Sequence, residues 1–71
     1  MTTAPFRYRS EFALRYYNQG EARALLTILD TRGVHVPDHI RADIMACTDT
    51  TQLEAWIRRA VTADTIQDVL A

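Results

Sequence analysis

The sequence predicts an all-α fold, a small bundle of four or five helices in which the first helix is long and protrudes. Apolar residues recur at helical spacing along most of the chain, and capping residues or helix breakers separate these apolar segments. No run alternates between polar and apolar residues as a half-buried strand would. The chain has 71 residues and therefore room for one domain, which we expect to span residues 10–71.

The first helix is predicted over residues 10–32, after an N-terminal arm over residues 1–9. Ser10 is a suitable N-cap, and Gly33 is a suitable residue to end the helix in a left-handed conformation. The interior Gly20 costs only about 1 kcal/mol relative to alanine, so we expect the helix to continue through it. Such a helix is about 34 Å long, whereas a compact domain of this size is roughly 28 Å across. Its N-terminal end should therefore protrude.

Three shorter helices are predicted to follow, over residues 37–47, 50–61 and 63–70. Pro37 favours the first turn of one helix, because proline presets the backbone there. Asp49 and Gln52 have the spacing of a capping box at the start of the next helix. Thr62 is the predicted N-cap of the last. We expect the helices to share a core made of Leu25, Leu26, Leu29, Ile40, Ile44, Leu53, Trp56, Ile57, Ile66 and Leu70.

The composition excludes several classes of protein. A net charge of −1 and 48% hydrophobic residues do not fit a generally basic nucleic-acid binder or a disordered acidic tail. A single core of this size rarely supplies more than roughly 3–5 kcal/mol. Cys47 is the only cysteine, so no internal disulfide can add to this stability. We therefore expect the chain to self-associate.

Aromatic residues are concentrated at the N-terminus, where five of the six precede residue 18. Residues 1–19 carry three arginines against one glutamate, whereas residues 20–71 carry five arginines against eight acids. We interpret Tyr8, Phe12 and Tyr16, spaced by four, as a contact stripe for a partner helix, with Arg7, Arg9 and Arg15 as charges at its rim. The predicted interaction residues are Tyr8, Phe12, Arg15, Tyr16 and Tyr17. In the simplest case the partner is a second copy, giving a dimer in which two antiparallel helices bring their aromatic residues together.

Nucleic-acid binding is the alternative interpretation of the same segment. Arginines interleaved with aromatic residues can neutralise phosphates and stack on bases. The residues that would make these contacts are Arg7, Arg9 and Arg15. Three arginines form a small basic surface, and the chain as a whole is not basic, so protein contact is the preferred interpretation.

No pattern in the sequence predicts an active site, a metal site or a cofactor. His35 and His39 are four residues apart, but Pro37 lies between them and prevents both from sharing a helical face. Cys47 has no histidine placed to activate it and lies on an apolar helical face. We therefore expect a protein that is not an enzyme. No signal peptide or membrane-spanning segment is predicted, which favours a cytoplasmic location.

Several segments resemble a known family, namely GEARALLTILDTRG over residues 20–33, Val36-Pro37, residues 44–49, and QLEAW over residues 52–56. Together they resemble the C-terminal helical segment of bacterial PD-(D/E)XK nuclease/transposase-like proteins of the recombination-promoting nuclease (YhgA-like) group. The resemblance covers residues 10–71 and implies a helical accessory segment with a role in association or regulation. It also implies a candidate partner, a longer nuclease-like homologue. The chain contains no lysine, so the nuclease motif is absent and no catalytic residue carries over.

Overall fold

The computed structural model of the protein describes residues 3–71, with side chains from residue 12 onward. Within residues 3–71 the secondary structure consists of helices without any strand, which confirms the predicted all-α class. The four helices, in chain order, are α1 (Thr3–Thr31), α2 (Asp38–Ala46), α3 (Thr50–Ala60) and α4 (Ile66–Leu70).

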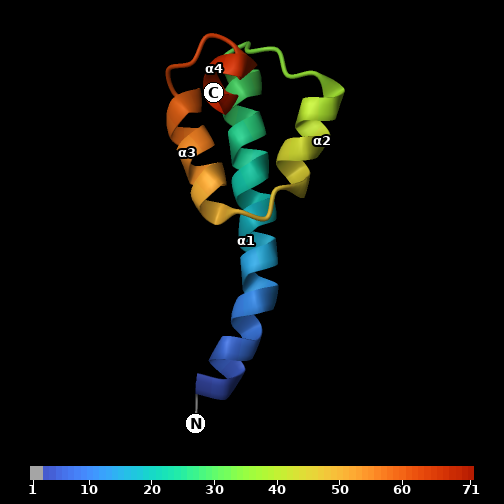
Figure 1. Ribbon diagram of the computed structural model, residues 1–71, viewed down its shortest axis with the longest axis vertical. Coiled ribbons are helices and arrows are strands. Elements are labelled where there is room, and N and C mark those ends of the chain that lie inside the picture. The colour runs from blue at the N-terminus through green and yellow to red at the C-terminus, as the bar shows by residue number, and fades with distance from the viewer. Residues whose placement is uncertain (1–2) are drawn as a thin grey trace.

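The long helix α1 is the centre of the molecule, with α2 on one side and α3 on the other (Figure 1). The short α4 packs against α3, near the C-terminal end of α1 (Figure 1). A helix of 29 residues is about 43 Å long. The molecule measures 48 Å in its longest dimension and only 21 and 20 Å in the other two. The predicted protrusion of the first helix is confirmed, because its N-terminal half extends beyond the other helices (Figure 1).

The first helix starts earlier than the sequence predicted. It begins at Thr3, so Ser10 lies inside the helix rather than capping it, and the predicted arm over residues 1–9 is helical from Thr3 on. Pro5 does not prevent this, because it lies in the first turn, where backbone N–H groups have no partner within the helix. The first helix can therefore begin before Pro5, even though Ser10 further along is a residue type that favours an N-cap.

The two glycines have opposite roles in α1. Gly20 lies in the uninterrupted helix, as predicted. Gly33 has a φ of 76°, and this left-handed conformation ends the helix, also as predicted. The N–H of Gly33 donates to the carbonyl of Asp30 at 3.1 Å, and the N–H of Val34 donates to that of Leu29 at 2.8 Å. These two bonds form a Schellman motif, which satisfies carbonyls at the end of the helix.

Capping follows the prediction in α3 but not in α4. The carboxylate of Asp49 accepts a hydrogen bond from the N–H of Gln52 at 3.2 Å, which confirms the predicted N-cap. The prediction that Thr62 caps the last helix was wrong. Thr65 caps it instead, with its hydroxyl accepting from the N–H of Asp68 at 3.2 Å. The N–H of Thr62 still donates to a carbonyl of α3, so this residue belongs to the end of the preceding helix.

The start of α2 also differs slightly from the prediction. Pro37 precedes the helix in an extended conformation, and Asp38 is the first helical residue. The helix is connected to α1 by an ion pair between Arg41 and Asp30, with a nitrogen–oxygen distance of 2.8 Å. The hydrogen bond from Arg41 holds the pKa of Asp30 below its usual value. Both side chains are substantially exposed, so this pair adds little to stability.

The core lies where α1 is surrounded by the other helices. Six residues of the predicted core are buried, namely Leu25, Leu26, Leu29, Ile44, Leu53 and Ile66. The other four predicted members are partly buried and pack against it: Ile40, Trp56, Ile57 and Leu70. Six smaller residues that the predicted core omitted are also buried: Ala22, Val34, Val36, Ala60, Ala63 and Val69. The core therefore ends at residue 22 along α1.

Two arginines connect the helix ends on the side of the molecule away from the protrusion. Arg32 donates to the carbonyl of Ala60 at 3.0 Å and also to that of Ala63. Arg59 donates to the carbonyl of Val69 at 3.0 Å. Cations at these positions satisfy carbonyls that helix ends leave without partners. This network fixes α4 and the end of α3 to α1.

Candidate interaction surface on the first helix

The protruding part of α1 exposes large apolar side chains. Phe12 and Tyr16 keep 63% and 66% of their surface accessible. Their rings meet edge to face, with the ring centroids 5.4 Å apart and the ring planes at 85°. Because residues four apart are neighbours on a helix, the two rings form one continuous aromatic surface. We call Phe12 and Tyr16 the aromatic pair.

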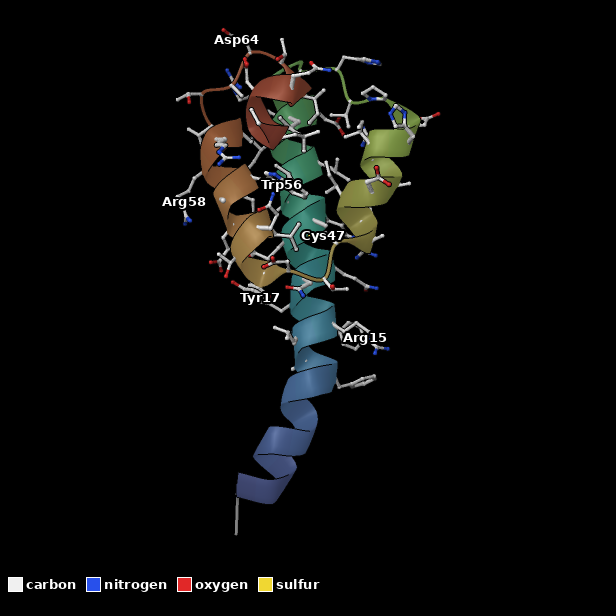
Figure 2. The ribbon with its side chains drawn as sticks, in the orientation of Figure 1. Arg15, Tyr17, Cys47, Trp56, Arg58 and Asp64 are labelled. Carbon is white, nitrogen blue, oxygen red and sulfur yellow. The ribbon has the colours of Figure 1, made fainter. Side chains whose placement is uncertain are left out.

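The aromatic residues of α1 do not share a single face. Successive residues are about 100° apart around an α-helix, so Phe12 and Tyr16 lie about 40° apart, whereas Tyr17 lies about 140° from Phe12. Figure 2 shows Tyr17 beside the base of α3 and Arg15 pointing away on the other side of α1. Phe12 and Tyr16 of the predicted stripe therefore lie together, whereas Tyr17, another predicted interaction residue, lies on a different side of the helix.

Tyr17 is engaged within its own chain. Its hydroxyl donates a hydrogen bond to Oε2 of Glu54 in α3 at 3.0 Å. This bond, together with a second carboxylate at Glu21, raises the pKa of Tyr17 to about 12 from its usual value near 10. The neighbouring carboxylates favour the protonated phenol, because it can donate and the phenolate cannot. Tyr17 therefore serves first as a contact between α1 and α3, although about half of its surface stays exposed.

Asn18 marks the boundary between the bundle and the protrusion, and sequence reasoning missed it. Its side chain is only 5% exposed. Its amide nitrogen donates to the carbonyl of Thr48 at 3.0 Å, and its amide oxygen accepts from the hydroxyl of Thr50 at 2.6 Å. The available signal was its spacing, four residues before the buried Ala22, on the apolar stripe of the helix. Asn18 thus holds the connection between α2 and α3 against α1.

A shallow hollow adjoins the aromatic pair. It is lined by Phe12, Arg15, Tyr16 and Gln19, and its volume is about 160 Å³. Pockets for small molecules usually enclose about 300–1,000 Å³. The hollow is about half the volume of the smallest of these pockets. Arg15 borders it, whereas the other predicted contact residues Arg7, Tyr8 and Arg9 lie outside the residues whose side chains are described.

The exposed side of α1 continues from the aromatic pair along the bundle. Between residues 12 and 27, seven exposed residues lie within about 120° of the helix circumference, and we call them the open face: Phe12, Ala13, Tyr16, Gly20, Arg23, Ala24 and Thr27. The large side chains lie at its N-terminal end, and residues with small side chains, apart from Arg23, lie at its C-terminal end. Buried residues such as Leu25 and Leu29 lie on the opposite side of the helix. The bundle thus covers one side of α1 and leaves the other uncovered.

The residues with metal-binding or nucleophilic side chains that the sequence singled out, His35, His39 and Cys47, lie outside α1. Among residues 12–71, no three histidine, cysteine or acidic side chains are grouped closely enough to hold a metal ion. His35 and His39 are both exposed, and Cys47 is partly buried against the core. The indole nitrogen of Trp56 is buried without a hydrogen-bond partner among the described residues. Within residues 3–71, no helix has both the length and the apolar composition that spanning a bilayer requires.

Comparison of the chain with known protein families, with curated proteins and with solved structures finds no match. The resemblance to a helical segment of nuclease/transposase-like proteins therefore stays a prediction.

Proposed function

We propose that this chain is a non-catalytic helical interaction module that self-associates through the protruding part of α1. The observation that carries the proposal is the exposure of the aromatic pair, about two thirds for each ring. Burying a large apolar side chain is worth roughly 1.5–3 kcal/mol, so a partner that covers both rings gains substantially. The core of so short a chain contributes little stability, so burial of the aromatic pair by a partner is a large gain by comparison.

The geometry of the protrusion supports this role. The edge-to-face contact holds the two rings next to each other before any partner arrives. Aromatic side chains also have few rotatable bonds, so their ordering on binding costs little entropy. Arg15, which lines the same hollow as the aromatic pair, lies on α1 beyond the ends of α2 and α3 (Figure 2), so another helix can approach this part of α1 from the side. These features are typical of a contact surface.

The partner that requires the fewest assumptions is a second copy of the chain, because every copy carries the same exposed rings. The resemblance noted in the sequence suggests a further partner, a longer nuclease-like homologue whose corresponding helix occupies the same surface. In that case the small protein regulates the longer one. The cytoplasmic location predicted from the sequence likewise stays a prediction.

Sedimentation equilibrium at micromolar concentration tests self-association. We expect the native chain to form a dimer and a Phe12→Asp/Tyr16→Asp double variant to sediment as a monomer, because charged residues would have to be buried in the contact. Val61→Asp is the matched control, since Val61 is an exposed apolar residue outside α1 and its replacement should leave assembly intact. A native chain that stays monomeric, or a double variant that assembles normally, would contradict the proposal.

A second candidate function is binding of nucleic acid by an accessory protein. The observation in its favour is that Arg15 borders the aromatic pair and Arg23 lies further along the open face. Phosphate contacts predict binding that weakens steeply with salt and is lost when Arg7, Arg9 and Arg15 are replaced by alanine. Absence of micromolar binding at about 50 mM salt, where such contacts are strong, would leave self-association as the function.

A further inference from the structure

We propose that two copies of this chain pair their α1 helices in antiparallel orientation, with Gly20 at the twofold axis. In this pair, Tyr16 of each copy fits into a hole on the other copy formed by Gly20, Arg23, Ala24 and Thr27. The inference rests on the proposed function and adds to it the identity of the partner, the orientation and the register. It concerns the open face of α1, whose residues are all exposed in the single chain.

The distribution of side-chain size along the open face favours the antiparallel orientation. Its N-terminal end carries the aromatic pair, and its C-terminal end carries Gly20, Ala24 and Thr27. A parallel pair would set large residues against large ones and small against small, which leaves gaps beside the small residues. An antiparallel pair with its axis near the middle of the open face sets Tyr16 of each copy against the small residues of the other. Protein contacts pack most densely when large and small side chains alternate in this way.

Gly20 has no packing role within its own chain. A Cβ atom added at this position would meet nothing within 4 Å, so the fold has room for any side chain there. Its backbone is helical and does not need the conformational freedom of glycine. Glycine also lowers the stability of a helix interior. Close packing of a second helix would explain a glycine at this position, because without a side chain the two backbones can come close together.

The register follows from the positions of Tyr16 and Gly20. With Gly20 at the axis, residues an equal number of positions before and after it face each other, so Tyr16 faces Ala24 of the other copy. Helices commonly pack by inserting one side chain between four residues at i, i+3, i+4 and i+7. Residues 20, 23, 24 and 27 have this spacing, and three of them have small side chains. The hole therefore lies directly opposite the ring that has to fill it.

Arg23 adds a polar contact to this arrangement. Seen down the helix axis, Tyr16 and Arg23 both lie on the same flank of the contact, to one side of Gly20 and Thr27. The twofold axis runs perpendicular to the plane that contains the two helices, so a residue on one flank of this plane has its counterpart on the same flank. The guanidinium of Arg23 therefore lies beside the Tyr16 ring of the other copy. Arginine next to an aromatic ring is a favourable cation–π contact. The twofold symmetry makes this contact between Arg23 and Tyr16 occur twice in the dimer.

The contact is small for a stable dimer. It runs along about 16 residues of α1, which corresponds to about 24 Å of helix. The open face contributes seven described residues per copy, whereas standard protein interfaces use about 20–30 residues per side. We therefore expect a dissociation constant in the micromolar range. Sedimentation should show a monomer–dimer equilibrium whose dimer fraction rises with concentration.

A cysteine scan tests the register on the full chain. Residues 13, 20 and 27 are seven positions apart, lie on one side of α1 and are all exposed. Each is replaced singly by cysteine in a chain with Cys47→Ser, and the proteins are oxidised at a concentration where the native chain dimerises. We expect a disulfide-linked dimer from Gly20→Cys alone. The Ala13→Cys and Thr27→Cys thiols are about 21 Å from their counterparts along the axis, whereas a disulfide needs Cα atoms within about 7 Å.

Each other outcome contradicts the inference in a recognisable way. Linkage at position 13 alone indicates that the aromatic residues meet each other, with the axis near residue 14. Linkage at all three positions indicates a parallel pair. A chain that dimerises in sedimentation but forms no linked dimer uses another surface, which overturns this inference and leaves self-association standing. A chain that is monomeric overturns both.

A leucine at position 20 provides an independent test. Gly20→Leu should leave the single chain folded, because nothing lies within 4 Å of the added Cβ atom and leucine favours helix. It should weaken dimerisation by roughly tenfold or more, because the larger side chain overfills the closest point of the contact. Circular dichroism confirms the fold, and sedimentation measures the dimer. Unchanged dimerisation of Gly20→Leu would overturn the proposed register.

Discussion

The two ends of α1 are parts of one continuous helix, yet they have opposite surroundings. In the C-terminal part, Leu25 and Leu29 are completely buried by the other helices. In the protruding part, Phe12 and Tyr16 are about two thirds exposed. The backbone is helical in both, so helical structure alone does not indicate burial. The difference shows that a packed segment can extend a helix into solvent, because adding a residue to an existing helix is much easier than starting a new one.

The transition between the two ends occurs at residues 17 and 18. Tyr17 reaches Glu54, and Asn18 holds the connection between α2 and α3. Toward the N-terminus from these residues, no described side chain of α1 is buried. The boundary is therefore made by polar contacts rather than by a break in the helix.

The largest expected effect separates core from protrusion. Leu29→Ala should lower the free energy of unfolding by about 2–5 kcal/mol, because it leaves a cavity in the core. Leu14→Ala removes the same atoms from the exposed part of α1 and should change stability by less than about 0.5 kcal/mol. Urea denaturation followed by circular dichroism measures both. Similar losses at the two positions would show that the protruding part is packed in solution.

The boundary itself gives the next largest effect. Asn18→Ala should lower the free energy of unfolding by about 1–3 kcal/mol, because the Thr48 carbonyl and the Thr50 hydroxyl lose their partner. Gln19→Ala, one residue further along, is the matched control and should stay within about 0.5 kcal/mol. If the two variants are equally stable, the buried amide does not hold the α2–α3 connection.

Replacing each of the two glycines by alanine should change the free energy of unfolding in opposite directions. Gly33→Ala should destabilise the chain by about 1–2 kcal/mol, because alanine is strained in the left-handed conformation. Gly20→Ala should stabilise the single chain by about 0.5–1 kcal/mol, because alanine favours helix and the added methyl group meets nothing. Thermal unfolding at a concentration below that of dimerisation measures both. A loss of stability in Gly20→Ala would contradict the open position of this residue.

The smallest expected effect is the pH dependence contributed by Tyr17. The pKa of Tyr17 is raised to about 12 in the folded chain, so the folded state holds this proton more tightly than the unfolded state does. The stabilisation is complete below about pH 10, the usual pKa of tyrosine, and is lost as the pH rises from 10 to 12. Tyr17→Phe should remove this part of the pH dependence. Tyr16→Phe is the control, and equal alkaline profiles for both variants would contradict the assignment.

Local signals predicted a large share of the fold. The apolar spacing located the helices and all ten predicted core residues, six of them buried and four packed at the edge of the core. Gly33 and Asp49 were predicted correctly, because the signals of a helix end and a helix start act through neighbouring residues. The N-cap of the last helix was predicted wrongly as Thr62 instead of Thr65. Both threonines are suitable N-caps by residue type, and only the point at which the preceding helix ends distinguishes them.

The candidate surface was predicted less completely. Phe12, Arg15 and Tyr16 are exposed, and their role in contact stays a prediction. Tyr17, which was also predicted to make contact, lies on another side of the helix and donates to Glu54. The sequence contained no sign of this contact, because the partner is 37 residues away along the chain. Asn18 was missed for the same reason, since its partners Thr48 and Thr50 come from a distant loop.

By itself, the sequence determined the helical class, the end of the first helix and the concentration of aromatic residues near the N-terminus. These features depend on periodicity and on contacts between residues close in the chain. Only the tertiary structure decided which side of α1 is covered, where the bundle ends and which aromatic residues stay open. The physical reason is that burial depends on where the other helices lie around α1, and residues far apart in the sequence set those positions.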